Sequence, residues 1–254
     1  MTSVGVLGAA GRMGREVCRA VDVADDLRLI AAVDPHHEGT ELGDLVVAGS
    51  TDALEGVDVA VDFTAPGSVI ENARWCLERG MHMVIGTTGI GEDGLAEIGR
   101  LTGSGKANAI VAPNFAIGAA LLMRFAEEAA RHFDAAEVIE LHHDRKVDAP
   151  SGTAITTAQR IGAARAGVWE APGGDGAHPG ARGADVDGIR VHGIRLPGLL
   201  AHQEVIFGGP GQTLILRHDT IDRSAFIPGV LLAIRTVANR PGLTVGLDAL
   251  LAHG

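Results

Sequence analysis

The first half of the chain alternates short apolar runs with longer amphipathic segments. Five of the apolar runs have the length and composition of buried strands, and they lie at residues 3–7, 27–33, 57–63, 82–85 and 108–111. Two segments between them have the spacing of amphipathic helices, at residues 12–24 and 66–79. Strands that alternate with helices are typical of a parallel sheet, in which ligands lie at the carboxyl ends of the strands.

The second half follows a different pattern. A long helix is predicted over residues 117–133, and a strand at residues 137–141 leads through a loop into another helix over residues 153–167. Three strands then follow one another without a helix between them, and we expect them to be antiparallel, at residues 189–195, 202–207 and 213–218. A glycine-rich loop is predicted over residues 171–187, and a final amphipathic helix over residues 226–238.

Glycines follow the first apolar run directly. Gly8, Gly11 and Gly14 separate that run from the first helix, and Asp34 ends the second run. A dinucleotide site needs these parts, because glycines let the backbone approach a pyrophosphate and the helix N-terminus faces its charge. The carboxylate accepts hydrogen bonds from ribose hydroxyls. The GxxGxxG spacing differs from the more familiar GxGxxG, so the glycines taken alone fit a tight turn as well.

Turn residues also follow the fourth and fifth runs. Since these positions share the carboxyl edge of the predicted sheet, they are candidates for cofactor binding, and an α/β sheet without a cofactor is the alternative. The expected cofactor contacts are Gly8, Ala9, Ala10, Gly11, Arg12, Met13, Asp34, Gly86, Thr87, Thr88, Ala112, Pro113, Asn114 and Phe115.

The end of the second run bears on the choice of cofactor. Asp34 favours a free 2′-hydroxyl and repels a 2′-phosphate, and Pro35 stands where an arginine would bind that phosphate. We therefore expect NADH to be accepted well. His36, His37 and Arg12 can still tolerate NADPH, so strict exclusion of NADPH is not predicted.

The two patterns predict an α/β protein with two domains. Residues 1–114 and 223–254 are expected to form a Rossmann-like dinucleotide-binding domain with a parallel sheet. Residues 115–222 are expected to form an α+β domain for substrate binding and oligomerisation, with a mainly antiparallel open sheet. Because an open sheet leaves one face uncovered, homo-oligomerisation through that sheet is expected.

Composition narrows the class of partner. The formal net charge of -11 opposes nonspecific binding to nucleic acid or to anionic membranes. Cys18 and Cys76 lie far apart without a CxxC pattern, which argues against a disulfide framework or a zinc ribbon. The first residues lack the features of a signal peptide and no apolar run has the length of a membrane span, so we expect a cytoplasmic protein.

One segment, EVIELHHDRKVDAPSGTA at residues 137–154, concentrates basic and hydroxyl side chains on the loop between a strand and a helix. A helix N-terminus carries unpaired N–H groups and partial positive charge, so Gly152 and Thr153 suit a carboxylate, and Lys146 adds a full charge beside them. Arg145 fits a surface role equally well. A solvated polar loop capped by Ser151 is the alternative interpretation of the segment.

Five other segments, which follow one another in order along the chain, resemble the same known family as this one. They are GAAGRMG near the start, GTTG, APNF, VHGIRLPGLLAHQEVIFG and LRHDTIDRSAFIPGV. Together they resemble the dihydrodipicolinate reductase family of the bacterial diaminopimelate and lysine pathway. The resemblance implies a tetrameric enzyme that reduces a small dicarboxylate, 4-hydroxy-tetrahydrodipicolinate, to tetrahydrodipicolinate with NADH or NADPH.

The resemblance also implies roles for individual residues. By position, His142 matches the proposed acid and Lys146 its partner in proton donation. Substrate contacts are implied for His143, Lys146, Ser151, Gly152, Thr153 and Thr88. The reaction fits these residues, because hydride addition to a cyclic imine displaces an electron pair that a proton must meet, and a histidine suits that transfer. Some relatives have a lysine within the first glycine loop, where this chain has Ala9 and Ala10, which weakens any claim about NADPH.

Three rival interpretations stay open. His142 and His143, with Glu140 and Asp144 nearby, suggest metal ligands of a hydrolase or lyase, but adjacent residues of a strand point to opposite faces, so no metal is expected. A noncatalytic redox sensor would bind a dinucleotide yet has no use for Lys146. A dehydrogenase for a different small acid is separated from the favoured activity only by testing substrates.

Overall fold

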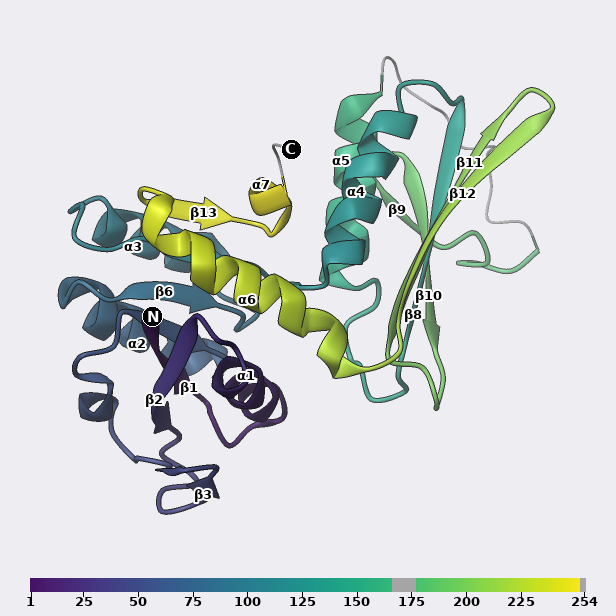
Figure 1. Cartoon of the computed structure of the whole chain (residues 1–254). Coiled ribbons are helices and arrows are strands. Elements are labelled where there is room, and N and C mark those ends of the chain that lie inside the picture. Colours follow the sequence, from purple (N-terminus) through teal and green to yellow (C-terminus); the bar gives the residue numbers. More distant parts are fainter. Residues whose placement is uncertain (166–176, 252–254) are drawn as a thin grey trace. The chain divides into compact units, whose positions relative to one another are not determined.

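The computed structural model describes residues 1–165 and 177–251, which form two compact units (Figure 1). The first unit comprises Met1–Ile117 and Arg223–Gly254, and the second comprises Gly118–Asp222. The chain therefore leaves the first unit after Ile117 and returns to it at Arg223. No helix among the described residues is long and apolar enough to cross a membrane.

The first unit is built on a sheet of six parallel strands in the order β13-β7-β6-β5-β1-β2. The strands are β1 (Thr2–Leu7), β2 (Leu27–Val33), β5 (Val59–Asp62), β6 (His82–Ile85), β7 (Ala109–Val111) and β13 (Leu243–Val245). Five of them correspond to the five predicted apolar runs, and β13 was not predicted. Because β2 and β5 flank β1 on opposite sides, the strand order reverses at β1, which is where doubly wound sheets bind ligands.

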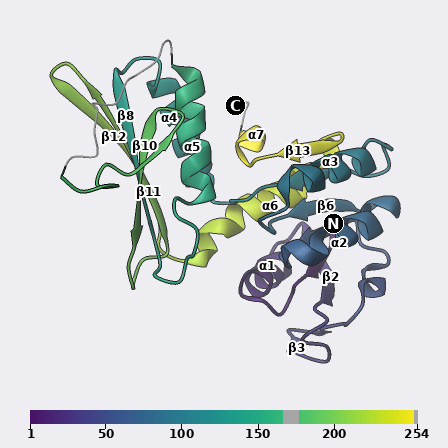
Figure 2. The same cartoon turned by 180° about the vertical axis from the view of Figure 1, so that it is seen from behind.

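Helices cover both faces of this sheet, as the two opposite views show (Figures 1 and 2). They are α1 (Arg12–Asp22), α2 (Pro66–Glu78), α3 (Gly91–Thr102), α6 (Ile227–Thr236) and α7 (Asp248–Leu251), with the 3-10 turns η1 (Thr51–Leu54), η2 (Arg223–Phe226) and η3 (Val237–Asn239). A short hairpin joins β3 (Glu41–Leu42) to β4 (Leu45–Val46). Pro66 stands in the first turn of α2, and Gly80 follows the helix with a φ of 82°, so local sequence sets both ends.

The second unit contains a sheet of five strands in the order β12-β11-β8-β10-β9. The strands are β8 (Ala135–His142), β9 (Ala184–Val186), β10 (Ile189–Arg195), β11 (Ala201–Gly209) and β12 (Gln212–Thr220). β8 pairs in parallel with β10, and the remaining three pairings are antiparallel. The three late strands β10, β11 and β12 follow one another along the chain as predicted, and β11 pairs antiparallel with β12, but β8 lies between β10 and β11 in the sheet. A parallel pair needs a crossover, and helix α5 (Gly152–Ala164) lies on the connection between β8 and β10.

Helices α4 (Ile117–Ala129) and α5 lie on the same face of this sheet (Figure 1). The core between them and the strands consists of alanine and aliphatic side chains together with Phe207. On β12, Ile215 is 55% exposed, as expected for a face that neither helix covers. The predicted glycine-rich loop falls partly on residues 171–176, outside the described residues, as does the predicted helix end at Gly167. In its described part the loop prediction was wrong at β9.

Candidate active site

The glycine turn of the first unit is shaped by backbone contacts. Gly8 has a φ of 74°, and a Cβ atom there would lie 2.6 Å from the carbonyl oxygen of Phe63. The N–H groups of Gly8 and Ala9 both donate to the Val33 carbonyl, at 2.8 and 3.1 Å, which ties the turn to β2. Helix α1 then begins after Gly11 without a side-chain cap, so its first N–H groups are available to an anion.

A pocket of about 480 Å³ opens at the carboxyl ends of β1, β2 and β5. Its lining includes Gly8 and Gly11 of the turn, Asp34 and His36 after β2, and Thr64 after β5. The position coincides with the reversal of strand order at β1, and the volume lies in the range of small-molecule sites. Three of the predicted cofactor residues therefore line one pocket.

The Asp34 carboxylate is oriented at the edge of this pocket. It is only 7% exposed, and its Oδ1 accepts a hydrogen bond from the His36 N–H at 3.1 Å and lies 3.1 Å from His37 Nδ1. Its Oδ2 has no hydrogen bond from any residue that the structure describes. One carboxylate oxygen is thus held by the protein while the other is left for a ligand.

A second, smaller pocket of about 150 Å³ gathers predicted cofactor residues from the start of α1 and from the loops after β6 and β7. Its lining is Met13, Phe63, Gly86, Pro113, Asn114, Phe115 and Phe226. The rings of Phe63 and Phe115 lie 5.9 Å apart, and a Cβ atom at Gly86 would lie 2.1 Å from the Phe63 ring. Glycine is therefore required beside this aromatic pair. Neither Phe63 nor Phe226 was predicted as a site residue. Phe63 also lines the pocket of about 480 Å³.

A buried carboxylate fixes the loops around these pockets. Asp62, at the end of β5, accepts hydrogen bonds from the Thr64 N–H and hydroxyl, from the Thr87 hydroxyl at 2.7 Å and from Asn72 Nδ2 at 2.8 Å. The hydroxyl of Thr87, a predicted cofactor contact, is therefore used within the protein, whereas Thr88 is exposed. The role of Asp62 was not predicted, because its partners lie on other elements.

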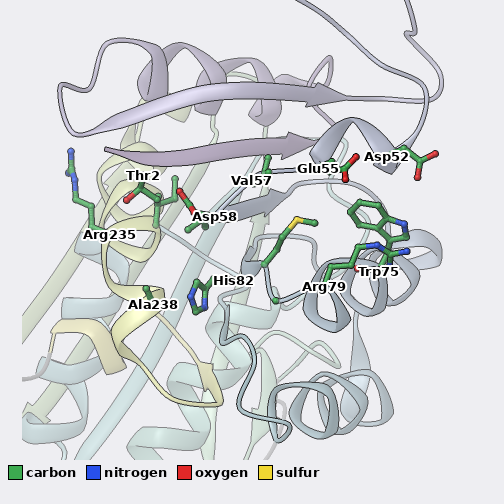
Figure 3. Close-up of a pocket in the computed structure, with 15 residues that line it drawn as sticks. Thr2, Asp52, Glu55, Val57, Asp58, Trp75, Arg79, His82, Arg235 and Ala238 are labelled. Atoms are coloured by element: carbon green, nitrogen blue, oxygen red, sulfur yellow. Dashed lines mark hydrogen bonds between the residues drawn. The ribbon is translucent and has the colours of Figure 1, made fainter.

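Another pocket of the first unit lies at the opposite end of the strands. It has a volume of about 820 Å³ and is lined by Thr2, Asp58 and His82 near the starts of β1, β5 and β6 (Figure 3). Asp58 Oδ2 accepts from both the N–H and the hydroxyl of Ser3, and His82 Nδ1 accepts from the Asn108 N–H. Since parallel sheets bind ligands at the carboxyl ends of their strands, the two smaller pockets are the candidate cofactor site.

In the second unit, the ring of His142 is held by a buried acid. Glu140 and His142 lie two residues apart on β8 and therefore on the same face, with His142 Nδ1 2.5 Å from Glu140 Oε2. Arg195, at the end of β10, donates to both Glu140 oxygens at 2.8 Å, and the Ser151 N–H donates to Oε1 at 3.1 Å. Burial alone would raise the pKa of Glu140, but the hydrogen bonds from His142 and Arg195 outweigh it and lower that pKa.

Lys146 has a carboxylate partner on the same loop. Its Nζ lies 2.8 Å from each oxygen of Asp148, and this hydrogen bond is the main reason why the pKa of Asp148 is lowered. The lysine side chain is only 23% exposed. Arg195 also donates to the carbonyl oxygens of Lys146 and Asp148, at 3.3 and 2.5 Å, so the loop is attached to β10.

The neighbouring His143 carries an unsatisfied buried atom. Its Nδ1 is buried and has no hydrogen-bond partner among the described residues. Burial lowers the pKa of His143, and the positive charge of Arg145 lowers it further, which favours the neutral ring. A buried polar atom without a partner is costly, and a ligand that supplies one removes that cost.

Helix α5 begins directly after this loop. Ser151 caps it, since the serine Oγ accepts from the Ala154 N–H at 3.3 Å. Gly152 is exposed and Thr153 half-buried, and the first N–H groups of a helix have no acceptor within it. Ser151, a predicted substrate contact, thus uses both its N–H and its Oγ within the fold, whereas Gly152 and Thr153 can donate to a ligand.

The predicted residues His142, His143 and Lys146 and the start of α5 all lie on one short segment of the second unit. Among the described residues, no group of three or more His, Cys, Asp or Glu side chains is placed to hold a metal ion. Glu140 and Arg195 were not predicted as site residues. An acid two residues before His142 was a visible signal, whereas Arg195 lies 55 residues further along the chain from Glu140 and gave none.

Comparison with known proteins covers both units. The family model for the N-terminus of dihydrodipicolinate reductase matches residues 2–115, and the model for its C-terminus matches residues 118–251. The 4-hydroxy-tetrahydrodipicolinate reductase of Nocardia farcinica is 54% identical over 252 residues, covering 98% of each chain. That of Streptomyces griseus is 53% identical over 252 residues, covering 98% of this chain and 97% of the relative.

A solved structure is also similar over nearly the whole length. The dipicolinate-bound dihydrodipicolinate reductase from Paenisporosarcina sp. TG-14 superposes with a TM-score of 0.85 at 40% sequence identity. The match covers 98% of this chain and 99% of that one. Similarity therefore extends over both units, in sequence as well as in fold.

Proposed function

Since the chain belongs to the dihydrodipicolinate reductase family, we propose that it reduces 4-hydroxy-tetrahydrodipicolinate to tetrahydrodipicolinate, in the diaminopimelate route to lysine, with a nicotinamide nucleotide as the hydride donor. The observation that carries the proposal is the segment from β8 to the start of α5. It combines a histidine held by a buried acid, a lysine, and a helix N-terminus, which are the groups needed to protonate and hold a dicarboxylate.

The first unit has the features that a dinucleotide requires. The uncapped start of α1 and the backbone of Gly8 to Met13 suit the pyrophosphate, and the free oxygen of Asp34 suits a ribose hydroxyl. The pocket with Met13, Pro113 and Phe115 suits a flat ring, so these residues would hold the nicotinamide, which would supply hydride when bound. We propose that NADH and NADPH are both accepted, with Asp34 favouring NADH.

The second unit binds the substrate in this proposal. The N–H groups of Gly152 and Thr153 hold one carboxylate, and His143 Nδ1 gains the hydrogen-bond partner that it lacks in the protein alone. Lys146 adds positive charge, which it shares between the substrate and Asp148. That the relative from Paenisporosarcina was solved with dipicolinate supports a dicarboxylate as the class of ligand.

Proton donation falls to His142 and Lys146. Hydride addition at carbon displaces an electron pair in the substrate, and a proton from the protein must meet that pair. His142 is 15% exposed at its side chain, and its Nε2 has no hydrogen bond from the described residues, so this nitrogen is free to face the substrate. Lys146 assists by binding the substrate and by acting as a second donor.

Assembly and location complete the proposal. We infer a homotetramer formed through the sheet face that α4 and α5 leave uncovered, where Ile215 of β12 is exposed, and a cytoplasmic enzyme. Light scattering of the purified protein tests the assembly. A mass of four subunits is expected, and a monomer would contradict it.

The activity is tested by mixing the purified protein with freshly generated hydroxy-tetrahydrodipicolinate and following the loss of NADH absorbance, with NADPH in parallel. Rapid oxidation that depends on the substrate is expected, with the higher kcat/KM for NADH. Binding of NADH without oxidation would contradict the proposed reaction and favour another acid substrate or a noncatalytic sensor. The His142→Gln variant serves as the negative control, because it lacks the proposed proton donor and should oxidise NADH slowly.

A further inference from the structure

We propose that Glu140 is a positioning residue for His142: its carboxylate keeps the proton on Nδ1 of the imidazole, so that Nε2 is the nitrogen that gives its proton to the substrate. The kinetic part of this inference rests on the proposed function. The tautomer itself is a property of the protein alone and is tested separately.

The geometry leaves the Glu140 carboxylate a single arrangement. Its Oε2 lies 2.5 Å from His142 Nδ1 and 2.8 Å from an Arg195 Nη1 donor, and its Oε1 accepts from Arg195 Nη2 and from the Ser151 N–H. Both oxygens therefore have two partners. The side chain is 0% exposed, so water does not compete for these positions.

The charge of Glu140 decides which ring nitrogen carries hydrogen. An ionised carboxylate has acceptors only, so the hydrogen between the two side chains must belong to His142 Nδ1. Hydrogen bonds from His142 and Arg195 lower the pKa of Glu140 in spite of its burial, which favours the ionised carboxylate. His142 acts as an acid from its doubly protonated form: the Nε2–H bond breaks, its electron pair stays on the ring, and the proton joins the electron pair displaced in the substrate. The ring that remains is the neutral Nδ1–H tautomer, which Glu140 already binds.

The same carboxylate links three parts of the site. Glu140 contacts the end of β8 through His142, the end of β10 through Arg195, and the start of α5 through Ser151. Arg195 in turn holds the carbonyl of Lys146. A purely structural role would therefore affect the whole loop, including substrate binding, and the test must separate this outcome from control of the tautomer.

Glu140→Gln makes that separation possible. The amide oxygen can take the place of Oε1, where Ser151 and Arg195 Nη2 both donate. The amide NH₂ then lies beside His142, and Arg195 Nη1 loses its acceptor. Because that group donates, Nδ1 becomes the acceptor and the neutral ring changes to the Nε2–H tautomer. The start of α5 keeps its contact, so substrate binding is preserved while the ring is in the wrong form.

Glu137→Gln is the matched control. Glu137 stands on the same strand and also contacts a histidine and an arginine, His192 at 2.8 Å and Arg182 at 3.4 Å. An odd number of positions separates it from Glu140, so it lies on the other face of β8. We expect Glu140→Gln to lower kcat by about 100-fold with the KM for the dicarboxylate within about threefold, and Glu137→Gln to change neither by more than about twofold.

Nitrogen-15 NMR of histidine-labelled protein reads the tautomer directly, at a pH where the ring is neutral. The His142 signals are assigned by their loss in His142→Gln. We expect Nδ1–H in the wild type and Nε2–H in Glu140→Gln. An Nε2–H ring in the wild type would overturn the inference even if the Glu140 variant failed to fold, and so would a kcat for Glu140→Gln equal to that of the Glu137 control. Failure of the wild type to reduce the substrate would contradict the proposed function and leave the NMR result standing.

Discussion

A methyl group added at Gly14 should damage the cofactor site from within helix α1. A Cβ atom at this position would lie 2.1 Å from the Gly8 carbonyl oxygen and 2.8 Å from the Cα of Ala9, whereas ordinary contacts begin at 3.4 Å. Both neighbours are backbone atoms of a turn whose N–H groups are bonded to Val33. The turn cannot rotate away as a side chain would, so Gly14→Ala must move the helix by roughly 1 Å.

The expected magnitude follows from this overlap. Overpacking of a well-packed site costs about 1–3 kcal/mol of unfolding free energy. Gly67 of α2 is the matched control, because a Cβ atom there meets nothing within 4 Å, and Gly67→Ala should instead gain about 0.4–1 kcal/mol. The displaced start of α1 should also weaken NADH binding by about tenfold, or about 1.4 kcal/mol.

Two assays check this prediction. Urea denaturation compares the free energies of unfolding of wild type, Gly14→Ala and Gly67→Ala, and titration of NADH fluorescence compares their dissociation constants. We expect Gly14→Ala to be the less stable variant and the weaker binder. If it matched Gly67→Ala in both assays, the close approach of α1 to the glycine turn would not be what shapes the pocket.

Three further predictions concern single side chains. Asp34→Ala should weaken the binding of NADH more than that of NADPH, because only the unphosphorylated ribose can donate a hydrogen bond from its 2′-hydroxyl to the carboxylate. If paired KM measurements gave the reverse order, the assigned ribose contact would be wrong. His142→Gln should lower kcat with little effect on the substrate KM, whereas Lys146→Ala should lower kcat and raise KM. Wild-type kinetics in either variant would count against the role of that residue. Because the folded-state pKa of Glu140 lies below its ordinary value of 4.5, its stabilising effect is present above that pH and lost as the pH falls through the folded-state pKa. The Tm advantage of wild type over Glu140→Gln should therefore shrink in acid, and a constant difference would argue against an ionised Glu140.

The parallel sheet could be predicted because its strands are apolar and each ends in turn residues. Helix α3 was missed, since Gly91, Gly94 and Gly99 interrupt its helical pattern. Gly94 is nevertheless buried, where a Cβ atom would lie 3.0 Å from Cδ1 of Ile70 on helix α2. Close packing in the tertiary structure thus overrides the poor helix propensity of glycine.

The order of strands in the second unit could not be predicted from periodicity. Alternation shows that β8, β10 and β11 are strands, but not which of them are neighbours. Every second residue of β8 from Ala136 to Glu140 is buried, which fits its central place between β10 and β11. Local pattern does not reveal pairings between segments that are distant in the chain.

Some residues of the candidate site could be predicted from the sequence and others could not. His142, Lys146 and the start of α5 stand on one continuous segment, so their chemistry was visible in the sequence. The partner of Glu140, Arg195, comes from β10, and Phe226 comes from the segment that returns to the first unit. Residues that a fold brings together from distant segments leave no spacing signal in a single sequence.

The most direct test of the central claim is the transfer of hydrogen itself. NADH labelled with deuterium at the transferred position of the nicotinamide is incubated with the protein and hydroxy-tetrahydrodipicolinate, and the product is analysed by mass spectrometry. The account predicts tetrahydrodipicolinate that carries one deuterium bound to carbon, and none when the protein is omitted. Unlabelled product, or oxidation of NADH without formation of tetrahydrodipicolinate, would contradict it.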